Sequence, residues 1–147
     1  MAVDIKTASF GGNGGGAFEK QVVDNISIRT GKFVDQIKIN NVQHGGNGGG
    51  DRGSIVLNDN EYINTVELRS GSYIDFVKFT TNEGRVMGGG GSGGGHHLLE
   101  NIRVLAIGGR TGAYVDKLDI LYIDNYDSSS TDDYKDVMNN LSKEAKL

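Results

Sequence analysis

A five-residue pattern, glycine-x-aromatic-x-aspartate, occurs three times in this chain of 147 residues and restricts its fold more than any other feature. The copies cover residues 31–35, 71–75 and 112–116. An arginine stands two residues before the glycine of each copy: Arg29, Arg69 and Arg110. These arginines are 40 and 41 residues apart, and a fixed period of this length is typical of repeat architectures. We therefore expect three similar structural units in the region before residue 127.

Each unit combines a glycine cluster with short alternating apolar runs. The clusters cover residues 11–16, 45–50 and 88–95. After each of the three aspartates, apolar residues alternate with polar ones. The apolar residues are Ile37 and Ile39, Val77 and Phe79, and Leu118 and Ile120. This period of two indicates β-strands. Each unit offers about four short strands, too few to bury a hydrophobic face alone. We expect three such sheets to pack around one axis and bury their faces against each other.

Finer strand boundaries follow from the same pattern. Val42 is expected to face inward at the end of a strand that starts at Gln36. In the third unit, a strand over residues 98–107 and a turn around Gly108 and Gly109 are expected before the strand 117–123. A last strand at residues 125–126 is expected to close the repeat region.

The sequence divides into a β domain over residues 1–126 and a tail over residues 127–147. Within the tail, Ser130 or Thr131 could N-cap a helix over residues 132–146, with acidic residues early and lysines late. One interpretation is a frayed, partly helical or disordered tail without function. The other is that its apolar stripe docks on the β domain or on a partner chain, since so short a helix is marginal alone.

Composition limits the classes of function. The net charge is −4 with dispersed lysines and arginines, which argues against nucleic acid as a partner. The chain has no cysteine, so disulfides and thiolate metal sites are excluded. No apolar run reaches the roughly 20 residues of a membrane helix, and the first residues do not read as a signal peptide. We expect a soluble protein, cytoplasmic or secreted by a non-classical route, without membrane insertion, cofactor or metal.

The glycine clusters invite a phosphate-binding or calcium-binding interpretation, but the details do not fit. A P-loop needs lysine and a hydroxyl residue directly after its glycines, and no cluster has them. A calcium-binding glycine repeat needs aspartate where Gly16 and Gly50 stand. Glycine loops can instead present bare N–H donors, while a nearby aspartate accepts from several hydroxyl groups. Such a mixture of donors and acceptors, with an aromatic ring close by, favours a sugar.

The three motifs and their glycine loops resemble those of the jacalin-related lectins. The resemblance rests on residues 10–15, 44–49, 69–75, 81–85 and 118–122, and covers roughly residues 4–126. It implies an all-β fold, a β-prism of three four-stranded Greek-key sheets with pseudo-threefold symmetry. It also implies a mannose-specific lectin with three sugar sites, which binds high-mannose N-glycans of glycoproteins multivalently. Ten residues precede Gly11, whereas galactose-binding members expose a cleaved N-terminus there, so mannose is favoured.

The resemblance also implies roles for particular residues. Each aspartate would accept from sugar hydroxyls, while the last glycine of a loop donates from across the end of the prism. The expected pairs are Asp35 with Gly49, Asp75 with Gly94, and Asp116 with Gly15. The two residues before each valine or isoleucine of the motif complete the sites: Lys32 and Phe33, Ser72 and Tyr73, Ala113 and Tyr114. Exchange of the N-terminal strand in a homodimer, or a dimer through the tail, is a further expectation.

The first motif departs from the family pattern at two residues, with Phe33 in place of tyrosine and Lys32 in place of a small residue, and one alternative function remains. Phe33 lacks the hydroxyl group of its counterparts, so we expect the first site to be the weakest, by about 0.5–1.5 kcal/mol for one hydrogen bond. The histidines His44, His96 and His97 and the separated aspartates offer no catalytic constellation, so an enzyme is not expected. The alternative function is a protein-interaction or assembly module whose sugar sites are vestigial.

Overall fold

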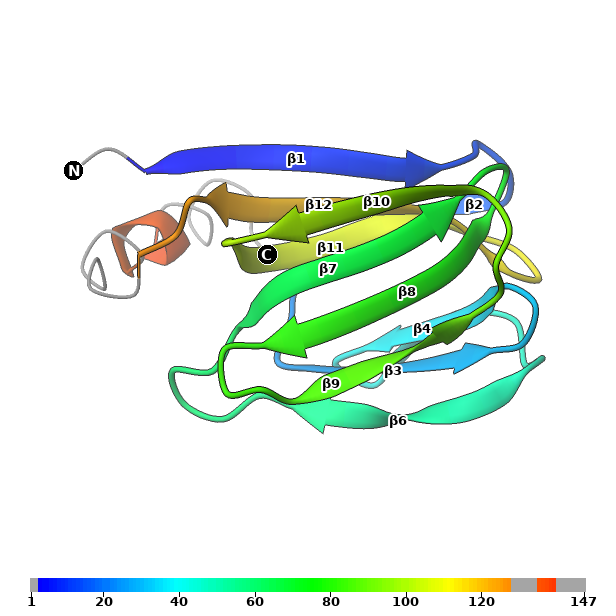
Figure 1. Ribbon diagram of the computed structural model, residues 1–147, viewed down its shortest axis with the longest axis horizontal. Coiled ribbons are helices and arrows are strands. Elements are labelled where there is room, and N and C mark those ends of the chain that lie inside the picture. Colours follow the sequence, from blue (N-terminus) through cyan, green and yellow to red (C-terminus); the bar gives the residue numbers. More distant parts are fainter. Residues whose placement is uncertain (1–2, 128–134, 140–147) are drawn as a thin grey trace.

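The computed structural model describes residues 3–127 and 135–139, and these residues form a β-prism (Figure 1). The strands are β1 (Asp4–Gly11), β2 (Gly16–Val22), β3 (Asn25–Thr30), β4 (Val34–Ile39), β5 (Val42–Gly45), β6 (Gly50–Val56), β7 (Ile63–Ser70), β8 (Ile74–Thr81), β9 (Val86–Gly90), β10 (Gly95–Glu100), β11 (Arg103–Thr111) and β12 (Val115–Asp124). Within the described residues, no helix is long and apolar enough to cross a membrane.

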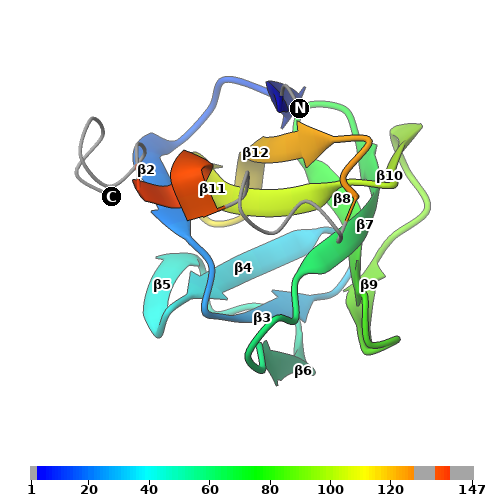
Figure 2. The same cartoon turned by 90° about the vertical axis from the view of Figure 1, so that its left-hand side faces the viewer.

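The strands form three four-stranded antiparallel sheets, which surround a common axis when the molecule is seen from one end (Figure 2). Their strand orders are β1-β12-β11-β2, β5-β4-β3-β6 and β10-β7-β8-β9. In two sheets three consecutive strands pair as hairpins and the fourth returns beside the first, which is the Greek-key order. In the third sheet β11 and β12 form the hairpin, and the N-terminal strands β1 and β2 complete the same order on either side of it. The predicted fold of three Greek-key sheets is therefore confirmed.

One sheet contains both the first and the last strand of the prism. Strand β1 pairs with β12 from Asp4 opposite Asp124 to Gly11 opposite Lys117, and the two strands run side by side in Figure 1. At the surface, Lys6 Nζ donates to Asp124 Oδ2 at 2.8 Å and Ser9 Oγ donates to Asp119 Oδ1 at 2.6 Å. Chain segments more than a hundred residues apart thus close the ring.

The inner faces of the three sheets supply one hydrophobic core. Its fully buried side chains alternate along the central strands of each sheet: Ile26, Ile28, Ile37, Ile39, Leu68, Ile74, Val77, Phe79, Ile107, Leu118 and Ile120. Burying a side chain of this kind stabilises a fold by about 1.5–3 kcal/mol. Because all three faces meet in one cluster, no sheet can keep its shape without the other two.

Three local expectations are wrong. Val42 is 46% exposed because it starts the edge strand β5 after a left-handed turn at Asn40 and Asn41. Gly108 and Gly109 lie inside β11, where a Cβ on Gly109 would meet the carbonyl of Lys117 at 2.0 Å, so glycine permits close strands here and makes no turn.

The end of the last strand also differs from the expectation. Strand β12 ends at Asp124, because Asn125 adopts a left-handed φ of 47° and Tyr126 leaves the sheet.

The tail contacts the prism through a short helical segment, residues 135–139, which lies at the end of the sheet formed by β11 and β12 (Figure 2). Val137 is buried against Leu105 and Ile123, and Met138 packs beside them. The predicted helix is confirmed for these five residues; the expected caps Ser130 and Thr131 lie outside the described residues. Val137 and Met138, the part of the apolar stripe that the structure describes, therefore pack on the prism itself.

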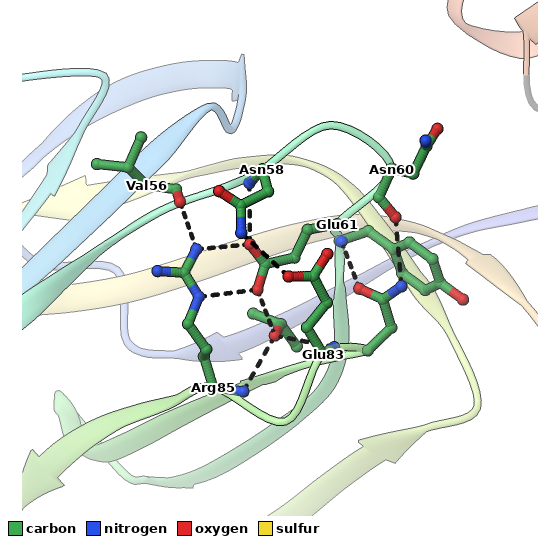
Figure 3. A network of polar contacts seen from close by, with 9 residues as sticks. Val56, Asn58, Asn60, Glu61, Glu83 and Arg85 are labelled. Carbon is green, nitrogen blue, oxygen red and sulfur yellow. Dashed lines mark hydrogen bonds and ion pairs between the residues drawn. The ribbon is translucent and has the colours of Figure 1, made fainter.

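An ion pair between the buried Glu61 and the partly exposed Arg85 joins the loops at the same end of the molecule (Figure 3). The side chain of Glu61 is fully buried and accepts from Arg85 Nε at 3.0 Å, Thr81 Oγ1 at 2.7 Å and the Asn58 amide at 2.9 Å. Arg85 also donates to the carbonyl of Val56. These bonds lower the pKa of Glu61 to about 2, chiefly through Arg85. The network fixes the end of the prism opposite the repeated motifs.

Candidate functional site

The three aspartates of the repeated motif occupy the same backbone position, a β-bulge at the start of the strands β4, β8 and β12. Thr30 pairs with Val34 and Arg29 with Gln36, which leaves Asp35 as the extra, unpaired residue. The same register shift isolates Asp75 and Asp116. A bulge re-aims the side chain of the residue that it leaves unpaired. The repeat thus places one carboxylate at the same end of each sheet.

The carboxylates are buried although each lies at a chain turn. Asp35, Asp75 and Asp116 are between 6% and 8% exposed. The Oδ1 atoms of Asp35 and Asp116 are inaccessible and accept no hydrogen bond within the protein. Native structures rarely leave a buried acceptor without a donor, and an exception calls for an explanation. The unpaired atoms show that no donor among the described residues has taken these carboxylate oxygens, which leaves them as acceptors.

A glycine loop covers each carboxylate, and its last two glycines face the two oxygens. A Cβ on Gly48 would lie 2.6 Å from Asp35 Oδ2, and one on Gly49 would lie 2.7 Å from Asp35 Oδ1. Gly49 also has a φ of +70°, a conformation that only glycine adopts without strain. The loops beside Asp75 and Asp116 repeat this geometry with Gly94 and Gly15. The structure thus brings together the three expected aspartate–glycine pairs.

Three arginines hold the glycine loops in place. Arg110 donates from Nε to the carbonyl of Gly14 at 3.0 Å and from Nη2 to that of Gly15 at 2.7 Å. Arg29 and Arg69 make the same forked contacts with their own loops. With their carbonyls bound by a planar guanidinium, the loops keep one orientation. In the sequence these arginines mark the period of the repeat, but their place in the site was not predicted; their fixed position before each motif was the available signal.

Each glycine loop also abuts a motif from another sheet. A Cβ on Gly46 would lie 2.4 Å from the carbonyl of Ala113, and the equivalent close contacts are Gly12 with Ser72 and Gly91 with Lys32. The main-chain N–H of Gly46 in turn donates to the carbonyl of Asp35 at 2.9 Å. Lys32, expected at the rim of the Asp35 site, thus has its backbone against the loop of the Asp75 site. The three sites form a closed ring.

The aromatic residues of the motifs meet inside this ring. The ring centroids of Phe33, Tyr73 and Tyr114 are 5.0–5.2 Å apart, in tilted or edge-to-face pairs. Such pairs contribute about 0.5–1.5 kcal/mol beyond the area they bury. The half-buried rings therefore link the three motifs, and each remains next to the aspartate that follows it by two residues.

The chemical groups at each site are suited to a neutral ligand that carries several hydroxyl groups. Its buried carboxylate supplies acceptors, its loop supplies backbone donors, and an aromatic ring lies beside them. The residues that the structure describes hold no cluster of three histidine or carboxylate side chains suited to a metal ion.

Comparison with known proteins agrees with this fold. Residues 7–121 match the family described as the jacalin-like lectin domain. The chain belongs to this family of lectins.

Among individual proteins, griffithsin from Griffithsia sp. is 44% identical over 114 residues, which cover 77% of this chain and 93% of griffithsin. The structure of wild-type Malaysian banana lectin is similar with a TM-score of 0.70 at 24% identity, covering 84% of this chain and all of that one. A mannose-binding jacalin-related lectin from Ananas comosus has a TM-score of 0.68 at 23% identity, covering 84% of this chain and 99% of that one.

Proposed function

We propose that this chain is a mannose-specific lectin with three monosaccharide pockets at one end of the prism. The carrying observation is the threefold recurrence of a buried, bulged aspartate whose two carboxylate oxygens face the last glycines of a loop. Mannose as the ligand is supported by the mannose-binding relative from Ananas comosus and by the unsatisfied acceptors of Asp35 and Asp116.

Within each pocket, the aspartate accepts hydrogen bonds from two neighbouring sugar hydroxyls. Backbone N–H groups of the glycine loop, from Gly15, Gly49 or Gly94, donate to the ring oxygen of the sugar or to a hydroxyl oxygen. The residues before the aspartate form the rim, and we assign Lys32, Ser72 and Ala113 to it. Bonds to an ionised carboxylate are roughly twice as strong as neutral ones, so the aspartate is the main determinant of affinity.

High-mannose N-glycans of glycoproteins are the natural multivalent partners in this proposal. Single polar pockets bind weakly, but linked sites gain about 10²–10⁴ in avidity when a ligand spans them. The three motifs interlock at one end of the prism, so three branches of one glycan or of neighbouring glycans can approach from the same direction. Function is binding without catalysis, since each site offers one carboxylate where glycoside hydrolysis uses two.

A glycan array with mannose as competitor tests the proposal. Retention of high-mannose glycans, abolished by free mannose, is the expected result. A truncation to residues 1–126 should retain this binding, whereas an assembly module that works through the tail would lose its partner. A homodimer formed by exchange of β1 stays a prediction; it would keep the β1–β12 register between two chains, and the mass of the particle in solution would reveal it.

A further inference from the structure

The outer face of the sheet β10-β7-β8-β9 contains an open groove beside the third glycine loop. Its volume is about 730 Å³, within the range of small-molecule sites. Residues 90–92 form one wall, and four side chains complete the lining: Glu67, Arg69, Phe76 and His96. His96, Arg69 and Phe76 lie opposite one another across three strands, so they form a row on one face.

The lining has the chemistry of a second sugar subsite. Phe76 offers a half-buried aromatic ring to the apolar face of a pyranose. Glu67 Oε2 and His96 Nε2 lie 2.8 Å apart at the surface, where a hydroxyl group can bond to both. Arg69 is committed to the carbonyls of the loop and keeps the wall rigid. The carboxylate of Glu67 disfavours an anionic ligand.

The other two copies of the repeat lack these groups. The register places Gln36, Ser27 and Asp51 around Arg29, and Lys117, Gly108 and Ala17 around Arg110, in the positions of Phe76, Glu67 and His96. Neither set contains an aromatic ring. In the first copy, moreover, Gln36 and Gln43 both donate to Asn47 Oδ1, at 3.4 and 2.9 Å, and this cap covers the side of the loop. Ser92 replaces that asparagine beside the groove.

The groove adjoins the Asp75 pocket through a shared loop. Gly93 and Gly94 face the carboxylate of Asp75, while the preceding residues 90–92 line the groove. Arg69 spans the two parts, because Nε donates to the carbonyls of Ser92 and Gly93 and Nη2 to that of Gly94. A glycan whose terminal residue occupies the Asp75 pocket can therefore place its next residue over the loop.

We propose that this groove is an extension subsite that takes the second mannose of an oligomannose chain bound at Asp75. The inference rests on the proposed sugar-binding function. It makes the Asp75 site selective for oligosaccharides, whereas the Asp35 and Asp116 sites bind single terminal residues without such extension.

Calorimetric titration of a single-site chain tests the subsite. In the full-length D35A/D116A background, methyl α-mannoside and the α1→2, α1→3 and α1→6 mannobioses are compared before and after F76Q, which introduces the residue of the first copy. We expect F76Q to weaken the best mannobiose about fivefold, the effect of roughly one lost contact, and to leave methyl α-mannoside unchanged. K117Q, at the equivalent position of the third copy, serves as the control and should change neither affinity.

NMR spectra of the backbone amides of the unaltered chain give an independent readout. The mannobiose should shift the amides of Ser92 and His96, which methyl α-mannoside leaves in place, while both ligands shift Gly93 and Gly94. Equal effects of F76Q on both ligands, or unshifted Ser92 and His96, would overturn the subsite and leave the proposed function standing. If no mannoside binds the unaltered chain, the proposed function itself fails and the subsite with it.

Discussion

Gly49 and Asp35 approach so closely that a methyl group on the glycine would lie 2.7 Å from Oδ1 of the carboxylate. No side chain fits between them, and the φ of +70° at Gly49 adds a backbone penalty for any residue other than glycine. Gly49 lies in the loop between β5 and β6, whereas Asp35 lies on β4 of the same sheet. It is repeated by Gly94 with Asp75 and by Gly15 with Asp116.

Replacing this glycine should close one pocket and spare two. G49A should abolish mannose binding at the Asp35 site and lower stability by about 1–2 kcal/mol through its backbone strain. G53A is the matched control, since Gly53 has a φ of +93° but its Cβ would meet nothing within 4 Å. Both variants carry the strain, yet only G49A should lose a site in calorimetric stoichiometry. Loss of a site in both would show that strain alone is responsible.

The arginine fork should matter for binding more than for folding. R110A leaves two loop carbonyls without their donor, so we expect the loop to lose its orientation and mannose affinity at the Asp116 site to fall about tenfold or more. R110K should not restore binding, because lysine cannot make the forked contact. NMR titrations that follow the backbone amides of each site would measure this affinity, and the unfolding temperature would show whether the fold is retained. Full affinity in R110K would refute the positioning role.

The aromatic residues of the three motifs predict an order of affinities for the three sites. Phe33 is the one member of the triad without a hydroxyl group, so F33Y should strengthen the Asp35 site by a factor of about 2–12, corresponding to one hydrogen bond of about 0.5–1.5 kcal/mol. The complementary changes Y73F and Y114F should weaken their own sites. Titrations in chains reduced to one site give the three affinities directly. An Asp35 site already equal to the others would contradict this order.

Acid should destabilise the fold through Glu61. Its folded-state pKa of about 2 lies below the usual 4.5, so the ionised form contributes stability fully above about pH 4.5, and this is lost as the pH falls through 2. E61Q should lower the free energy of unfolding at pH 7 by about 1–3 kcal/mol, because it breaks the bonds to Arg85. The deficit should shrink as the pH approaches 2. Urea unfolding at several pH values measures it, and the exposed Glu19, outside this network, provides the control in E19Q.

A second pH effect is expected from His44. Its ring stacks on Phe18 of the neighbouring sheet at 4.0 Å, its Nε2 is buried without a hydrogen bond, and burial lowers its pKa below 6.5. The unfolded chain therefore binds the proton more readily, so stability is full above about pH 6.5 and falls as the pH decreases through the folded-state pKa. H44F, which introduces the residue found at Phe10 in the first unit, should remove this dependence. An unchanged slope between pH 7 and 5 would assign the effect to other groups.

The repeat made much of the fold and site predictable. Period-two alternation behind each aspartate identified the inner strands, and the 40-residue spacing gave three equivalent units. The bulge that isolates Asp35 was not predictable, because it arises from the pairing of β3 with β4 and leaves no mark in local composition. The same holds for the pair of Glu61 and Arg85, which lie 24 residues apart on different loops and meet only after the prism has closed.

The glycines show the same limit from another side. Clusters that form loops and the pair Gly108 and Gly109 inside β11 have similar composition. What separates them is the approach of a neighbouring backbone, in this case the carbonyl of Lys117, and this depends on the assembled sheet. The residues that recur are therefore visible in the sequence, whereas the binding of the loops by Arg29, Arg69 and Arg110 is visible only in the structure.

The central claim is that three aspartates define three independent mannose sites. Calorimetric titration of mannose against the unaltered chain, the three single Asp→Ala variants and the triple variant D35A/D75A/D116A tests it most directly. The account predicts three equivalents bound by the unaltered chain, two by each single variant and none by the triple variant, with the fold retained. Undiminished mannose binding by a folded triple variant would contradict it.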